Sequence, residues 1–278
     1  MSELIDSTSF LLKEERKVKQ RVITAVVALV FFIPVLYIGS WTLEIVAAAM
    51  GLVGLFELFR MKGNSFFTIE GLLASIGMLL LLVPTERLSF LPSNYSPLYL
   101  FYICGILLLV CTVFSKNSFS FDDAGVAILG ALYIGYGFHY FIATRAAGLD
   151  LLMYILFVVW ATDIGAYMFG RKIGKHKLAP AISPNKTIEG SLGGILSALV
   201  VAALYLTFYP QDYSMGIMLA LTVLFSIFGQ LGDLVESAFK RHYDVKDSGK
   251  ILPGHGGILD RFDSLLFVLP MLHLVALI

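Results

Sequence analysis

The chain has 278 residues, of which 58% are hydrophobic and only 14% are charged, whereas a soluble domain carries about 25% charged residues. This composition excludes an intrinsically disordered chain, and two cysteines are too few for a disulfide-stabilised secreted scaffold. A formal net charge of zero argues against a basic nucleic-acid-binding protein, so no nucleic-acid partner is expected. The composition therefore indicates a polytopic membrane protein whose partner is the lipid bilayer.

Nine apolar stretches follow in chain order, each near the roughly 17–25 residues that a helix needs to cross the hydrocarbon core. They cover residues 22–38, 41–59, 69–83, 98–114, 124–144, 149–169, 190–209, 215–231 and 262–278. Glu44 and Glu57 are single acids within the second stretch and are interpreted as structural. The stretches are continuous and do not alternate, which excludes a β-barrel. The sequence thus predicts an all-α fold, a polytopic membrane helical bundle with about nine transmembrane helices.

Basic residues are distributed unequally between the two sides of this predicted bundle. Of the 20 Lys and Arg residues, all but Arg87 and Arg145 fall in the N-terminal tail or in alternate connections. Because cytoplasmic loops carry an excess of Lys and Arg, this side is predicted to be cytoplasmic, with N-in and C-out. We expect a cytoplasmic arm at residues 1–21, an N-terminal transmembrane region at 22–148 and a C-terminal one at 149–278.

Two long polar connections, residues 170–189 and 232–261, lie on the predicted cytoplasmic side. Loops longer than about 12–15 residues are usually functional or disordered, and these two lack a low-complexity composition. Both connections belong to the C-terminal transmembrane region, which we therefore expect to carry the functional site.

The second connection gathers acidic residues. Spacings of i, i+3, i+4 and i+7 place four residues on one helix face: Asp233, Glu236, Ser237 and Lys240. Asp260 and Asp263 follow at the start of the last span. A salt-bridged helix end explains any one of these acids, but four carboxylates at the edge of hydrocarbon would repel one another unless a cation were bound. Oxygen ligands suit a hard ion, above all Mg²⁺.

Basic residues and glycines lie between these carboxylates. They are Lys240, Arg241, Lys246, Lys250, Arg261 and the run Gly254-His255-Gly256-Gly257. Glycines allow backbone N–H groups to approach an anion closely. Acids, bases and glycines together indicate a site for a metal-bound polyphosphate, although no P-loop motif is present. For His255, a phosphate contact and a purely structural place in the turn are equally compatible with the sequence.

The first connection repeats this chemistry more weakly. Asp163 and Arg171 recur at helical spacing at the end of an apolar run, where an acid indicates function unless the two residues form a buried ion pair. Several further polar residues follow: Lys177, Ser183, Lys186, Thr187 and Glu189. Thr187 would also suit a helix start, and the positive-inside bias alone would explain the basic residues.

The segment from Ser237 to Asp263 resembles the signature of the phosphatidate cytidylyltransferases, also called CDP-diacylglycerol synthases. It reads SAFKRHYDVKDSGKILPGHGGILDRFD. The family pattern fixes Ser, Lys-Arg, Lys-Asp, His-Gly-Gly, Asp-Arg and a final Asp, and every fixed position is met over these 27 residues. Upstream blocks from Trp160 onward also match, so the resemblance covers about residues 155–264.

The resemblance implies an integral enzyme of the bacterial inner membrane, with its active site facing the cytoplasm, that makes CDP-diacylglycerol and pyrophosphate from CTP and phosphatidate. It also implies a Mg²⁺-dependent site, and it leaves open a second cation and a homodimer. The residues fit this chemistry, because the lipid phosphate is already anionic and needs no general base. Catalysis then reduces to positioning two anions and neutralising charge at the α-phosphorus.

The predicted roles divide into three groups. The predicted metal ligands are Asp233, Asp260 and Glu236. The predicted catalytic residues are Lys240, Arg241, Lys246, Arg261 and Asp263. The predicted substrate-binding residues are Asp163, Arg171, Lys177, Ser183, Lys186, Thr187, Glu189, Ser237, His255, Gly256 and Gly257.

Two other functions stay open at this point. An enzyme that activates another lipid phosphate with CTP, such as a polyprenyl phosphate, would need similar carboxylates and bases. An ion or organic-anion transporter could also use intramembrane acids, but such transporters often have two related halves. Here the acids of the candidate site lie in the C-terminal half, and no internal repeat is evident.

Overall fold

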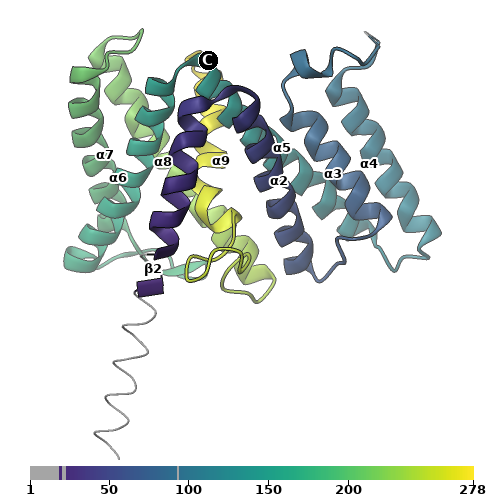
Figure 1. Ribbon diagram of the computed structural model, residues 1–278. Coiled ribbons are helices and arrows are strands. Elements are labelled where there is room, and N and C mark those ends of the chain that lie inside the picture. Colours follow the sequence, from purple (N-terminus) through teal and green to yellow (C-terminus); the bar gives the residue numbers. More distant parts are fainter. Residues whose placement is uncertain (1–18, 21–22, 93) are drawn as a thin grey trace, which may run out of the picture.

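The computed structural model describes residues 19–20, 23–92 and 94–278. Within these residues nine α-helices pack side by side as a bundle (Figure 1). In chain order they are Ile23–Ile38, α2 (Ser40–Lys62), α3 (Ile69–Leu82), α4 (Pro97–Phe114), α5 (Phe121–Ala147), α6 (Leu149–Ile173), α7 (Ile188–Phe208), α8 (Met215–His242) and α9 (Leu259–Leu274). Six of the described helices are long and apolar enough to cross a membrane. The predicted all-α membrane bundle is confirmed.

Three of the predicted spans form shorter helices. Helix Ile23–Ile38 and α3 are apolar but fall below the length of a full crossing, and α9 has 16 residues. The 14 residues of α3 rise about 21 Å, which is less than the roughly 30 Å of a hydrocarbon core. The exact number of spans therefore stays a prediction. The predicted N-terminal arm, residues 1–21, lies almost entirely outside the described residues.

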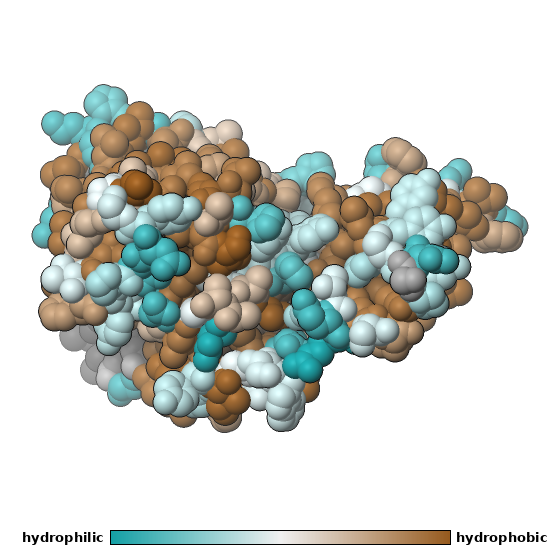
Figure 2. Space-filling view, turned by 90° about the horizontal axis from the view of Figure 1, so that it is seen from above, coloured by the Kyte–Doolittle hydropathy of each residue, from teal (hydrophilic) through white to brown (hydrophobic). Residues whose placement is uncertain are grey.

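The two ends of the bundle differ in charge. The described chain begins at the bottom of Figure 1 and ends at the top, and the polar connections after α6 and α8 lie at the bottom. At the other end, Arg87 forms a double hydrogen bond with Glu44, and Arg145 donates to the carbonyls of Leu36 at 2.5 Å and Tyr37 at 2.9 Å. The structural interpretation of Glu44 is thus confirmed. Figure 2 views this end, where hydrophilic side chains lie between broad hydrophobic areas.

A β-hairpin occupies the first polar connection, which the sequence predicts only as a loop. Strand β1 (Lys177–Ala179) pairs antiparallel with β2 (Ser183–Thr187). Glu189 holds its base, because the carboxylate accepts the backbone N–H of Lys175 at 3.0 Å and lies 2.6 Å from Nδ1 of His176. The strands are short and polar, so they lack the alternating pattern by which a strand is recognised in sequence.

Glycines allow the helices around the site to approach closely. A Cβ atom on Gly194 of α7 would lie 2.7 Å from the carbonyl oxygen of Thr162 on α6. A Cβ atom on Gly232 of α8 would lie 2.5 Å from the carbonyl oxygen of Asp263 on α9. Small residues of this kind bring helix backbones together in membrane bundles. The contact at Gly232 places its neighbour Asp233 beside the start of α9.

Candidate active site

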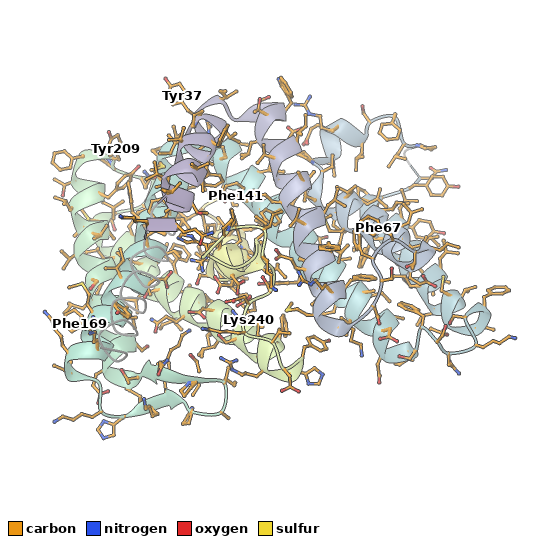
Figure 3. All side chains as sticks on the ribbon, turned by 60° about the horizontal axis from the view of Figure 1, so that its bottom comes forward. Tyr37, Phe67, Phe141, Phe169, Tyr209 and Lys240 are labelled. Carbon is orange, nitrogen blue, oxygen red and sulfur yellow. The ribbon has the colours of Figure 1, made fainter. Side chains whose placement is uncertain are left out.

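Lys240 lies between two carboxylates at the polar end of α8. Its Nζ contacts Oε2 of Glu236, one turn earlier, and is 2.7 Å from Oδ1 of Asp260 on α9. The side chains of Lys240, Glu236 and Asp260 are 13%, 1% and 5% exposed. In Figure 3 Lys240 lies near the middle of this end, next to the loop that leads into α9. Glu236 and Lys240 thus share one helix face, as the spacing predicts.

The glycine-rich loop closes around Asp260. Its Oδ2 accepts hydrogen bonds from the backbone N–H of Ser248 at 2.9 Å, the hydroxyl of Ser248 at 2.9 Å and the N–H of Gly257 at 2.8 Å. Gly256 has a φ of +85°, and a Cβ atom there would lie 2.3 Å from the same oxygen. The glycines are therefore required by the fold of the loop, and the N–H of Gly257 is already paired with a protein carboxylate.

Glu57 of α2 reaches into this loop from the N-terminal half of the chain. Its carboxylate is 2% exposed and accepts the backbone N–H of Ile258 at 2.9 Å, the N–H of Leu259 at 3.0 Å and the hydroxyl of Ser248 at 3.1 Å. A carboxylate at a helix N-terminus satisfies N–H groups that have no partner within the helix. Glu57 therefore fixes the start of α9, and with it the position of Asp260.

A second ion pair lies one turn before Glu236, on the same face of α8. Lys186 of β2 is 2.6 Å from Oδ2 of Asp233, and Ser237 donates to Oδ1 of Asp233 at 3.3 Å. Asp163 of α6 and Asp263 of α9 lie close enough for their charges to interact with that of Asp233. Three helices and the hairpin thus bring these five predicted site residues together.

A polar cavity opens in front of this second pair. Its volume is about 450 Å³, and it lies between α6, the hairpin, α7 and α8. The predicted site residues that line it are Asp163, Arg171, Lys186, Thr187 and Asp233. Two basic side chains and two acidic ones thus face one space that can hold a small polar ligand.

Several other predicted site residues lie outside these clusters. Arg241 donates to the carbonyl oxygen of Ile182 at 3.2 Å, so it ties α8 to the hairpin. Lys246 is exposed and lines a separate cavity. Lys177 and Ser183 lie on the hairpin and are not among the described residues that line the polar cavity.

Two predicted residues lie at the loop's outer side. Arg261 donates through Nε to the carbonyl oxygen of His255 at 2.9 Å. Nδ1 of His255 is buried and has no hydrogen-bond partner among the described residues. Both interpretations of His255, as a structural residue of the turn and as a contact for phosphate, therefore remain compatible with the structure.

The structure also tests whether the carboxylates fit a metal ion. Among the described residues no group of three His, Cys, Asp or Glu converges to hold a metal. Lys240 and Lys186 already supply positive charge beside these carboxylates, so the repulsion between the acids does not by itself require a metal ion. The all-oxygen donors still fit Mg²⁺, which is usually held by one or two carboxylates together with substrate phosphates. The magnesium site stays a prediction.

Comparison with known proteins identifies the family. The sequence model of the Cytidylyltransferase family matches residues 19–278. The chain belongs to this family. The phosphatidate cytidylyltransferase of Staphylococcus haemolyticus is 47% identical over 257 residues, which are 92% of this chain and 98% of that protein. The phosphatidate cytidylyltransferases of Staphylococcus saprophyticus and Staphylococcus epidermidis are 46% and 45% identical over the same shares.

The resemblance found in the C-terminal motif is thus confirmed, and it extends over the N-terminal half of this cytidylyltransferase family member. Sequence reasoning missed two residues of the site. For Glu57 a structural role is favoured over a functional one, and its cap on α9 agrees with this, but the sequence did not indicate that the cap would position Asp260. Ser248 carried no signal, because a single serine in a polar loop is indistinguishable from a solvated one.

Proposed function

We propose that the chain transfers a cytidylyl group from CTP to phosphatidate, giving CDP-diacylglycerol and pyrophosphate. The observation that carries this proposal is the polar cavity lined by the Lys186–Asp233 pair at one end of a membrane bundle. A site in this place accepts a water-soluble triphosphate from one side and a lipid from the bilayer. The name that the staphylococcal relatives carry gives the same reaction.

The residues suggest how the reaction proceeds. Lys186 and Arg171 face the polar cavity and would bind the phosphates of CTP. Lys240 is held between Glu236 and Asp260, so its ammonium group would be fixed in position for developing negative charge. The lipid phosphate is the nucleophile and pyrophosphate leaves, so no side chain has to remove a proton.

Asp233 is the carboxylate best placed to hold Mg²⁺, because it faces the cavity and is 33% exposed. Asp163 lines the same cavity, the charges of Asp163 and Asp263 interact with that of Asp233, and their oxygens are of the kind that Mg²⁺ prefers. When bound, the ion would neutralise charge on the triphosphate. Asp260 and Glu236 lie beside Lys240, and we retain them as candidate ligands.

Incubation of the purified protein with radiolabelled CTP, Mg²⁺ and phosphatidate tests the proposal. We expect a labelled lipid and an equal amount of pyrophosphate. A polyprenyl phosphate assayed in parallel separates this function from the activation of another lipid phosphate. Labelled lipid from polyprenyl phosphate alone would overturn the proposed substrate. Uptake into vesicles without any labelled lipid would indicate a transporter.

We also propose that the site faces the cytoplasm, as the positive-inside rule indicates. Cysteines can be placed at Lys250 and Ser214, which are exposed at opposite ends of the bundle, in a chain without Cys104 and Cys111. In intact cells, an impermeant thiol reagent should label Ser214→Cys and reach Lys250→Cys only after permeabilisation. The reverse pattern would contradict the orientation.

The transfer should occur by direct displacement. The two cysteines lie in α4, away from the site, and the lipid phosphate needs no activated protein nucleophile. Without phosphatidate, we therefore expect no exchange of labelled pyrophosphate into CTP, and no label on the denatured protein after incubation with CTP labelled at the α-phosphorus. The control is the same α-labelled CTP with phosphatidate, in which label should pass to the lipid. Exchange without lipid, with label retained on the protein, would show a covalent intermediate.

A further inference from the structure

A second cavity adjoins the same side of α6 as the polar cavity, where Leu156 and Trp160 line it. It has a volume of about 640 Å³ and is bounded by helix Ile23–Ile38, α2, α6 and α9. Its walls are almost entirely apolar, with Ala28, Phe32, Met50 and Leu265 among the lining residues. The volume lies within the roughly 300–1,000 Å³ of typical ligand sites.

Helix Ile23–Ile38 forms the outer wall of this cavity and is tied to the bundle at both of its ends. At its far end Arg145 binds the carbonyl oxygens of Leu36 and Tyr37, and at its near end Thr24 donates to the carbonyl of Pro253 at 3.0 Å. Between these ties, the lining residue Phe31 stays 73% exposed. The wall is therefore held at both ends, and the cavity opens at the lipid-facing surface of the bundle. Figure 1 shows this helix standing in front of α9.

The depth of the cavity matches one leaflet of a bilayer. Its lining residues on this helix run from Thr24 to Val35, a rise of about 16 Å along the axis. Half of a hydrocarbon core of roughly 30 Å is about 15 Å. An acyl chain of one leaflet therefore fits along the wall.

The only charged residue among the described lining residues lies at the end near the site. Arg261 is exposed there, beside His255, whose buried Nδ1 lacks a partner in the described part of the chain. The charge of Arg261 also interacts with that of Asp163, which lines the polar cavity. On α6, Trp160 lines the apolar cavity and Asp163, three residues later, lines the polar one. Arg261 thus lies where the two cavities come nearest.

We propose that the apolar cavity binds an acyl chain of phosphatidate, with the lipid phosphate held at Arg261 and His255. The inference rests on the proposed function, and it assigns the two substrates to neighbouring cavities along α6. An acyl chain supplies the apolar surface that the walls require. An anionic headgroup complements the guanidinium group at the mouth.

The test narrows the cavity and compares lipids of different length. Ala28→Trp fills the wall, and Val30→Trp on the same helix is the matched control, because Val30 is 63% exposed and outside the lining. We expect Ala28→Trp to raise the KM for dioleoyl phosphatidate about tenfold or more. Its KM for CTP and its turnover of dihexanoyl phosphatidate should match those of Val30→Trp. Equal KM values for dioleoyl phosphatidate in the two variants would overturn the proposal.

A second measurement does not depend on the variant's folding. Wild-type protein is irradiated with phosphatidate that carries a diazirine near the end of one acyl chain, and the labelled peptides are identified by mass spectrometry. We expect label on helix Ile23–Ile38 and α9, reduced by excess dioleoyl phosphatidate. Label confined to lipid-exposed α4, in a protein that still makes CDP-diacylglycerol, would overturn this site and leave the proposed function intact. If the wild-type protein turned over no phosphatidate of any chain length, this would instead contradict the proposed function.

Discussion

Asp233→Asn should lower kcat by at least about 100-fold, because it removes the charge that faces the polar cavity without changing the shape of the side chain. The protein should stay folded, since Asp233 and its partner Lys186 are 33% and 26% exposed and the freed ammonium group can be solvated. Turnover measured against Mg²⁺ concentration, with a melting curve in detergent, tests both parts. If Asp233 holds the ion, the variant should also need more Mg²⁺ for its residual rate.

Asp244→Asn is the matched control for this variant. Asp244 is exposed at the same end of the bundle, in the loop after α8, and lies outside both the polar cavity and the fixed positions of the family signature. Its removal changes the local charge by the same amount, so it should leave kcat within about twofold of wild type, because exposed charges are well screened. Wild-type turnover by Asp233→Asn at low Mg²⁺ would exclude this carboxylate as a metal ligand.

Glu57→Gln should lower both stability and turnover, although Glu57 lies in the N-terminal half. The amide has only one oxygen to accept from Ile258, Leu259 and Ser248, and its NH₂ group would face N–H donors. Hydrogen bonds to buried charged groups are worth about 1.5–3 kcal/mol each. We therefore expect the free energy of unfolding to fall by at least about 2 kcal/mol. Chemical unfolding in detergent measures this change.

The effect of Glu57→Gln on catalysis should fall on kcat rather than on the KM for CTP, because the loop positions Asp260 and Lys240, and neither of these residues lines the polar cavity. Glu44→Gln is a matched control in the same helix. Its exposed pair with Arg87 lies at the far end of the bundle, and such pairs contribute about 0–1 kcal/mol. Equal stability and turnover in the two variants would show that Glu57 does not position the site.

The helical architecture was predictable because it depends on long apolar stretches and on a charge asymmetry. Each of the nine stretches contains a helix in the described chain, and the basic connections lie at one end. The lengths were less predictable, because α8 continues beyond its apolar part to His242. Its polar last turns are helical because Lys240 pairs with Glu236 within the helix and with Asp260 on α9. A hydropathy profile does not detect such ion pairs.

The site was predictable as a set of residues but not as a set of contacts. The spacing placed Glu236 and Lys240 on one face, and the family resemblance indicated Asp233 and Asp260. It did not indicate that lysines would neutralise these acids, since Lys186 comes from a hairpin 47 positions before Asp233. Nor could it indicate that Glu57 would cap α9, a contact across about 200 residues that depends entirely on tertiary packing.

The cap that Glu57 places on α9 also limits how the protein can be divided. A fragment that begins at residue 149 carries the complete C-terminal motif and all the described residues that line the polar cavity, and it resembles a minimal catalytic module. Such a fragment would leave the N–H groups of Ile258 and Leu259 without their acceptor. Separate expression of the two halves would restore the site only if α2 found its place against α9 again. The C-terminal motif can therefore be moved into another protein only together with α2, whose Glu57 precedes the start of α9 by about two hundred residues.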